Sequence, residues 1–100
     1  MTQKKQKIYK LSEFYKIFGD ATRLHILYLL LENKNCVKEI SELLQVSQSA
    51  ISHQLKILRM YHFVKAEKNG QCVIYSITDK HIKSILEDGM EHIEEIVNQF

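Results

Sequence analysis

Two histidines and two carboxylates near the C-terminal end of the sequence have the types and spacing of a metal site. They are Asp79, His81, His92 and Glu95, on a helix predicted over about 79–97. On a helical wheel of about 100° per residue, His92 lies about 20° from His81, and Glu95 about 40° to the other side. An apolar stripe borders them, formed by Ile82, Ile85, Leu86, Met90, Ile93, Ile96 and Val97. The candidate ligands therefore edge a seam where a partner helix would pack.

Helix geometry separates these four residues into two pairs. His81 and His92 are about 16 Å apart along an axis that rises about 1.5 Å per residue, whereas a ligand atom lies about 2 Å from a zinc ion. One helix cannot hold one ion with all four. Two antiparallel copies can, with Asp79 and His81 of one chain meeting His92 and Glu95 of the other at two symmetric sites. Two imidazoles and two carboxylates suit Zn(II) or Co(II) and disfavour Cu(I), and the choice among zinc, cobalt and nickel stays open.

The elements that must position these residues are predicted from periodicity and turn signals. Leu11, Phe14, Tyr15 and Phe18 recur at helical spacing, and Gly19-Asp20 ends that helix and starts the next. Further helices are predicted over 21–32, 37–45 and 48–60. Two β-type runs follow, at 63–68 and 72–77, with Asn69-Gly70 in the turn, which is a strong hairpin signal. Thr78 or Asp79 then caps the last helix.

This order, α-α-α-α-β-β-α, is mainly α with a β-hairpin wing and is typical of a winged helix-turn-helix. The sequence has no proline and only three glycines, so we expect residues 1–100 to form one domain without a linker. Its last helix, about 79–97, would serve dimerisation and metal binding. The terminal helices carry Phe14, Phe18, Ile85 and Ile93, too many apolar groups for the ends of a monomer. We therefore expect a homodimer that joins through these helices.

The predicted helix over 48–60 has the composition of a DNA-reading element. Ile51, Leu55 and Leu58 form its inward stripe. We expect base-edge and phosphate contacts from the remaining polar side chains and from the wing tip, because such groups serve both roles in a major groove. These residues are Gln48, Ser49, Ser52, His53, Gln54, Lys56 and Arg59, with Lys68 in the wing.

Charge and composition narrow the class of protein. Residues 1–78 carry 12 basic and 6 acidic side chains, and residues 79–100 carry 2 and 6, so a basic body suited to DNA precedes an acidic end. With 45% hydrophobic residues the chain is globular. No apolar run approaches the roughly 20 residues of a membrane span, and no signal peptide is recognised, so we expect a cytoplasmic protein. Cys36 and Cys72 fit no CxxC pattern and are expected to be free thiols.

Three stretches together resemble the ArsR/SmtB repressors: FGDATRLHIL at 18–27, LLQVSQSAISHQLKILR at 43–59 and VKAEKNGQCVIYSI at 64–77. The resemblance covers about 11–97. It implies a cytosolic homodimer that represses metal-export or metal-storage genes and leaves DNA when its effector binds. The pattern D-x-H-x10-H-x2-E of the C-terminal zinc site in SmtB-like repressors is matched at every position by Asp79, His81, His92 and Glu95.

The same resemblance implies a link from the metal to the reading helix. The backbone carbonyl of His62 would accept a hydrogen bond from the ring of His92, and Gln48 would extend that link. The family's other metal site, a cysteine pair, is incomplete here, because only Cys36 matches and Lys38 stands at the second position. Thiolate binding of arsenic, lead or cadmium is therefore disfavoured.

The sequence predicts a repressor whose metal-free dimer binds an inverted repeat and is released by zinc. Two alternatives remain open. The first is a repressor of the same fold that senses thiol oxidation through Cys36 and Cys72, and the second is a winged helix used only for protein contacts. No nucleophile–base set is recognisable, so an enzyme is not expected.

Overall fold

The computed structural model describes residues 2–99. These residues form α1 (Gln3–Ile17), α2 (Ala21–Glu32), β1 (Asn35–Cys36), α3 (Val37–Leu44), α4 (Gln48–Met60), β2 (Val64–Asn69), β3 (Cys72–Ile77) and α5 (Lys80–Asn98). The predicted order of helices and hairpin is confirmed, and β1 is an additional strand. None of the helices in this part of the chain is long and apolar enough to cross a bilayer.

The helix ends follow local capping chemistry. Asp20 caps α2, because its side chain accepts a hydrogen bond from the N–H of Arg23. The side chain of Ser47 caps α4 by accepting a hydrogen bond from the N–H of Ala50. Asp79, and not Thr78, caps α5. The first helix begins at Gln3, with Thr2 as its cap, well before the apolar repeat from which it was predicted.

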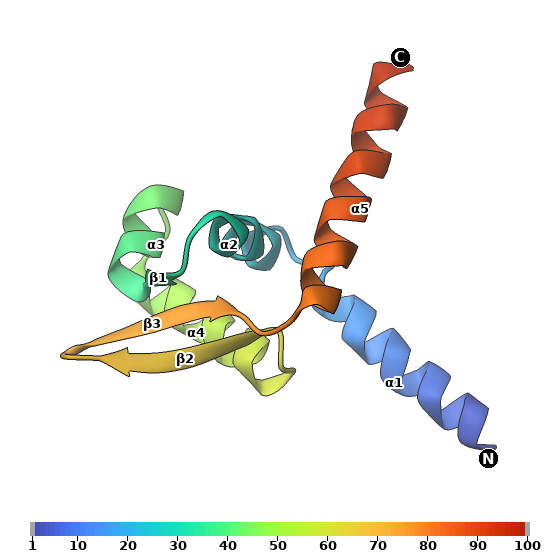
Figure 1. Ribbon diagram of the computed structural model, residues 1–100, viewed down its shortest axis with the longest axis horizontal. Helices are drawn as coiled ribbons and strands as arrows, with labels where there is room; N and C mark the ends of the chain where they lie inside the picture. Colours follow the sequence, from blue (N-terminus) through green and yellow to red (C-terminus); the bar gives the residue numbers. More distant parts are fainter. Residues whose placement is uncertain (1, 100) are drawn as a thin grey trace.

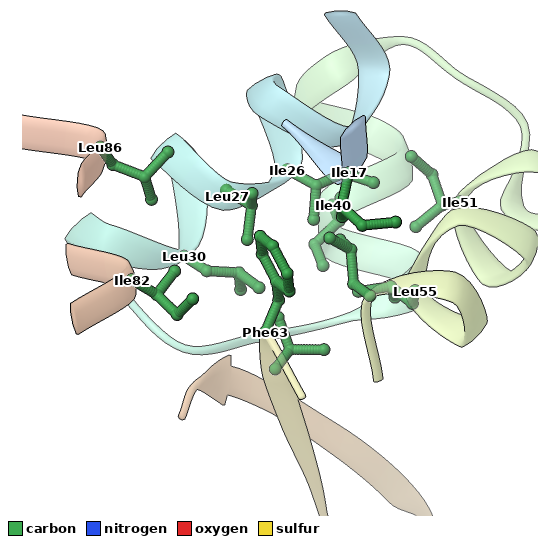
Figure 2. Close-up of a cluster of buried hydrophobic side chains, with 12 residues drawn as sticks. Ile17, Ile26, Leu27, Leu30, Ile40, Ile51, Leu55, Phe63, Ile82 and Leu86 are labelled. Atoms are coloured by element: carbon green, nitrogen blue, oxygen red, sulfur yellow. The ribbon is translucent and has the colours of Figure 1, made fainter. Parts of the chain in front are cut away.

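The core lies between α2, α3, α4 and the root of the hairpin. Figure 2 shows Phe63 in the middle of the cluster, with Ile82 and Leu86 of α5 on one side and Ile51 and Leu55 of α4 on the other. The rings of Phe14 and Phe18 lie 4.9 and 4.8 Å from that of Phe63, centroid to centroid. Phe63 therefore joins the end of α1 to the rest of the core.

The sheet has the order β1-β3-β2 and is antiparallel throughout. Asn69 pairs with Cys72, so the turn of the hairpin is Gly70-Gln71. Gly70 has φ +66°, which costs a glycine little. On the other edge, Asn35 and Cys36 pair with Tyr75 and Ile74 and hold the wing against the start of α3.

The terminal helices leave the body on the side away from the wing tip and point in different directions (Figure 1). The radius of gyration is accordingly 15.1 Å, above the roughly 13 Å of a compact domain of this length. Their apolar side chains stay largely exposed, among them Ile8, Leu11, Tyr15, Met90, Ile93, Ile96 and Val97.

Candidate DNA interface and effector site

A tight turn sets α4 against α3. Gln45 ends α3 in the left-handed conformation, with φ +57°, and the hydroxyl of Ser41 donates to the carbonyl of Val46. Ser47 then begins α4. Ile40 of α3 and Ile51, Leu55 and Leu58 of α4 are buried together, so the two helices are fixed as a helix-turn-helix.

The outward face of α4 is polar and exposed. It carries Gln48, Ser49, Ser52, His53, Lys56 and Arg59, all of which are exposed. Hydroxyls and an imidazole sit beside two cations on this face, and such groups can reach base edges and phosphates together. The geometry is thus compatible with the predicted DNA contacts of these six residues.

Gln54, the seventh residue of α4 predicted to contact DNA, is placed differently from these six. It lies about 160° around α4 from Ser52 and is half-buried. Its Oε1 accepts a hydrogen bond of 3.2 Å from Nη1 of Arg23 on α2. Gln54 therefore directs its Oε1 toward the body, and its contact with DNA stays a prediction. Arg23 was not singled out from the sequence, although the wheel position of Gln54 signals that its amide needs a polar partner.

The wing follows α4 directly. Lys68 is exposed at the end of β2, one residue before Asn69, and Gly70 forms the tip. Lys65 lies closer to the root, where its Nζ is 3.6 Å from Oε1 of Glu67. Lys68 thus stands at the tip of the hairpin, where a wing can approach a phosphate backbone.

The first pair of candidate ligands lies at the start of α5. Oδ1 of Asp79 accepts hydrogen bonds from the N–H groups of His81 (2.9 Å) and Ile82 (3.2 Å). The bond from Ile82, reinforced by that from His81, holds the pKa of the Asp79 carboxyl below its usual range. Nδ1 of His81 is 3.6 Å from Oδ1 of Asp79, and both side chains are exposed. Asp79 caps the helix with one oxygen, so Oδ2 is left for another partner.

The second pair, His92 and Glu95, lies one turn apart and exposed near the other end of α5. Within residues 2–99, no group of three or more His, Cys, Asp and Glu side chains comes together in one chain. The structure therefore brings Asp79 to His81 but does not bring this pair to His92 and Glu95 of the same chain.

The predicted link through His62 has a further member. His62 follows α4 with φ +62°, and its carbonyl accepts a hydrogen bond of 2.7 Å from the hydroxyl of Thr78. Thr78 directly precedes Asp79, so the turn after α4 is tied to the start of α5 within one chain. A carbonyl has two lone pairs, and a second donor to His62 remains compatible with this bond.

The cysteines lie on neighbouring strands of the sheet. Cys36 on β1 is half-buried, Cys72 on β3 is exposed, and both are free. They occupy the wing and its support, away from α5.

A helix-turn-helix with an exposed polar second helix, followed by a hairpin, defines a winged helix-turn-helix, the fold of a class of DNA-binding regulators. Comparison with known families matches residues 20–65 to one described as "Bacterial regulatory protein, arsR family". The chain is also 45% identical to an uncharacterized HTH-type transcriptional regulator of Methanocaldococcus jannaschii, over 81% of this chain and 92% of that protein. The chain therefore belongs to the arsR family of transcriptional regulators, which are not enzymes.

Two further relatives and a solved structure extend this result. A transcriptional repressor SmtB homolog of Synechocystis is 34% identical over 86% of this chain and 65% of its own length. A cadmium resistance transcriptional regulatory protein CadC homolog of Staphylococcus aureus is 32% identical over 94% and 78%. The homodimeric winged helix-turn-helix domain of a possible ArsR-family regulator of Mycobacterium bovis superposes with a TM-score of 0.88 at 20% identity, covering 95% of this chain and 88% of that one.

Proposed function

We propose that this chain is a repressor that binds operator DNA as a homodimer and is released when Zn(II) binds between the subunits. The observation that carries the proposal is the division of the candidate ligands into two exposed pairs at opposite ends of α5. Each pair is incomplete alone, and a second copy of α5 running antiparallel supplies the other pair. Repression and a metal response are also in keeping with the names of the SmtB and CadC relatives.

The exposed apolar surface of the terminal helices supports the dimer. An apolar groove of about 360 Å³ runs between α1, α2 and α5, lined by Tyr15, Phe18, Tyr28, Ile85, Met90 and Ile93 among others. A single chain leaves this groove open, and an apolar surface of this kind commonly marks an interface. The homodimeric state of the Mycobacterium bovis structure agrees with this arrangement.

DNA binding is assigned to the exposed face of α4 and to the wing tip. Ser49, Ser52 and His53 would contact base edges, while Lys56, Arg59 and Lys68 would contact phosphates. Gln48 stands at the start of α4, and His62 follows the opposite end of the same helix. An axial rise of about 1.5 Å per residue places the two about 20 Å apart, so Gln48 is assigned to DNA and not to the link through His62.

The donor set favours zinc. Asp79 keeps one carboxylate oxygen beyond its capping bonds, and the ring of His81 is exposed beside it. With His92 and Glu95 of the partner, two nitrogens and two oxygens would hold the ion, as zinc or cobalt prefers, with nickel as the alternative. A bound ion would supply a cross-link between the two copies of α5. The coupling is reciprocal, so DNA must weaken metal binding by the same factor.

A mixed dimer tests the shared site. His81→Ala and His92→Ala homodimers each lose one ligand from both sites. In a heterodimer of the two variants, one site lacks both histidines and the other is complete. We expect this heterodimer to bind one tight zinc, measured by competition with a chromophoric chelator, while neither homodimer binds any. Zinc should also release the heterodimer from DNA.

The metal-free forms provide the control. His81 and His92 lie on α5 and not on α4. The two homodimers and the heterodimer should therefore bind the operator equally without metal, as measured by fluorescence anisotropy. The operator is obtained by selection from a random-sequence duplex library with the wild-type protein. A verified heterodimer that binds no zinc would contradict the shared site.

A further inference from the structure

The side chain of Arg23 joins three elements of the fold. Its Nε donates to the carbonyl of Ile17 at 2.8 Å and its Nη2 to that of Lys16 at 3.5 Å, both in the last turn of α1. Its Nη1 donates to Oε1 of Gln54, in the middle of α4, at 3.2 Å. One guanidinium on α2 thus bonds the helix predicted to dimerise and the helix predicted to read DNA.

The surroundings of Arg23 make this contact directional. The donors of a guanidinium lie in one plane at fixed angles. An arginine side chain that bonds two helices therefore fixes the orientation of those helices relative to each other. The backbone of Arg23 is fixed at the start of α2, where its N–H donates to the carboxylate of Asp20 at 3.0 Å. Within residues 2–99 no carboxylate lies within ion-pair distance of its side chain. The charge instead faces the carbonyl end of α1, where a cation is favoured.

We infer that Arg23 and Gln54 are positioning residues that set the angle of α4 relative to α1, and thereby the spacing of DNA half-sites that the dimer accepts. The inference rests on the proposed dimer. If α1 is fixed to the partner subunit, a rigid link from α1 to α4 fixes the distance between the two reading helices. Dimers of this class contact half-sites about one helical turn apart, and one added base pair both shifts and rotates a half-site. With a rigid link between α1 and α4 the dimer should bind the altered spacing more weakly, whereas with a flexible link the two reading helices can adjust and the affinity should change little.

The experiment compares spacing penalties and not affinities alone. Wild-type protein and the Gln54→Met and Gln54→Glu variants are titrated with the selected operator and with versions whose spacer is one base pair longer or shorter. We expect the wild type to bind the altered spacers roughly tenfold more weakly, a loss similar to that of a mismatched base pair. Gln54→Met removes the acceptor at nearly equal volume, and its penalty should fall to about twofold. Gln54→Glu keeps an acceptor for Arg23 and should retain the wild-type penalty.

Two further measurements make the outcome decisive. Arg23→Lys replaces the planar guanidinium with a single ammonium group, which cannot bond both helices. Its spacing penalty should therefore fall as that of Gln54→Met does. This variant provides the test if Gln54→Met does not fold. Gln6→Met, on the exposed first turns of α1, should change nothing. A Gln54→Met dimer with the wild-type spacing penalty would overturn this inference and leave the proposed function standing. A wild-type chain that sediments as a monomer on DNA would overturn both.

Discussion

The body of the molecule and its two terminal helices differ in how far they bury their apolar side chains. In the body, from α2 to β3, Ile26, Leu27, Leu55 and Phe63 are fully buried. On α5, Ile93 is 54% exposed and Val97 is 63% exposed, and α1 exposes a similar face. The body therefore buries most of its large apolar side chains, with Leu43 and Met60 among the exposed exceptions, whereas the terminal helices bury Ile17, Ile82 and Leu86 and expose most of the others. Under the proposed function, DNA reading lies in the body and assembly in the terminal helices.

The largest effect is expected where the two regions meet. Phe63→Ala removes the ring that packs against Phe14 and Phe18 of α1 and leaves a cavity in the core. We expect a loss of about 3–5 kcal/mol in the free energy of unfolding, measured by urea denaturation. Tyr61→Ala, at a site 42% exposed only two residues away, should cost less than about 1 kcal/mol. Similar losses at both sites would show that the body does not depend on this junction.

A change confined to α5 should weaken assembly and spare the body. Ile93→Glu places a carboxylate in the proposed interface, where burying an unpaired charge is costly. We expect the dimer dissociation constant to rise on the order of 100-fold, measured by sedimentation equilibrium, with the helical circular dichroism retained. The control is Glu91→Gln, on the opposite side of α5 from the apolar stripe. A dimer that withstands Ile93→Glu would place the interface elsewhere.

Tyr28 links α2 to α5, and its effect should be smaller. Its hydroxyl donates to the carbonyl of Leu86, and Tyr28→Phe should cost about 1 kcal/mol. Burial raises the pKa of Tyr28, so its stabilisation is complete below the unfolded pKa of about 10 and is lost as the pH rises through the higher folded-state value. In thermal melts the difference between wild type and Tyr28→Phe should therefore shrink at strongly alkaline pH. Exposed Tyr9→Phe should give no difference at either pH.

The smallest effect concerns the wing tip. Lys68→Ala removes one proposed phosphate contact and should weaken binding to all DNA sequences alike. The slope of log K against log salt should become shallower by about one unit, measured by fluorescence anisotropy from low to moderate salt. Lys83→Ala, on α5, should leave the slope unchanged. A loss confined to one base position would assign Lys68 to base reading.

The sequence predicted those parts of the fold that depend on local pattern. The helix-turn-helix, the two hairpin strands and the cap at Asp20 follow from periodicity and side-chain chemistry, and all are confirmed. For the last helix the sequence left the cap open between Thr78 and Asp79, and the structure has Asp79. The two-residue strand β1 was missed, because two residues show no period. The early start of α1 was missed because its first turns are rich in lysine and lack the apolar repeat.

Residues whose roles depend on tertiary contacts were harder to predict. Gln54 has a polar side chain in a reading helix and was assigned to DNA, yet its place on the wheel directs it to Arg23. Thr78 was considered only as a cap, and its hydroxyl instead bonds the carbonyl of His62. The metal ligands at Asp79, His81, His92 and Glu95 remain a prediction, because they require a second chain.

The position of β2 at the edge of the sheet has a consequence for aggregation. An edge strand exposes unpaired N–H and C=O groups that can recruit a strand from another molecule. Here that edge carries Lys65, Glu67 and Lys68, all exposed, and charged side chains on an edge disfavour such recruitment. Edge-to-edge pairing of two hairpins is therefore disfavoured at the wing.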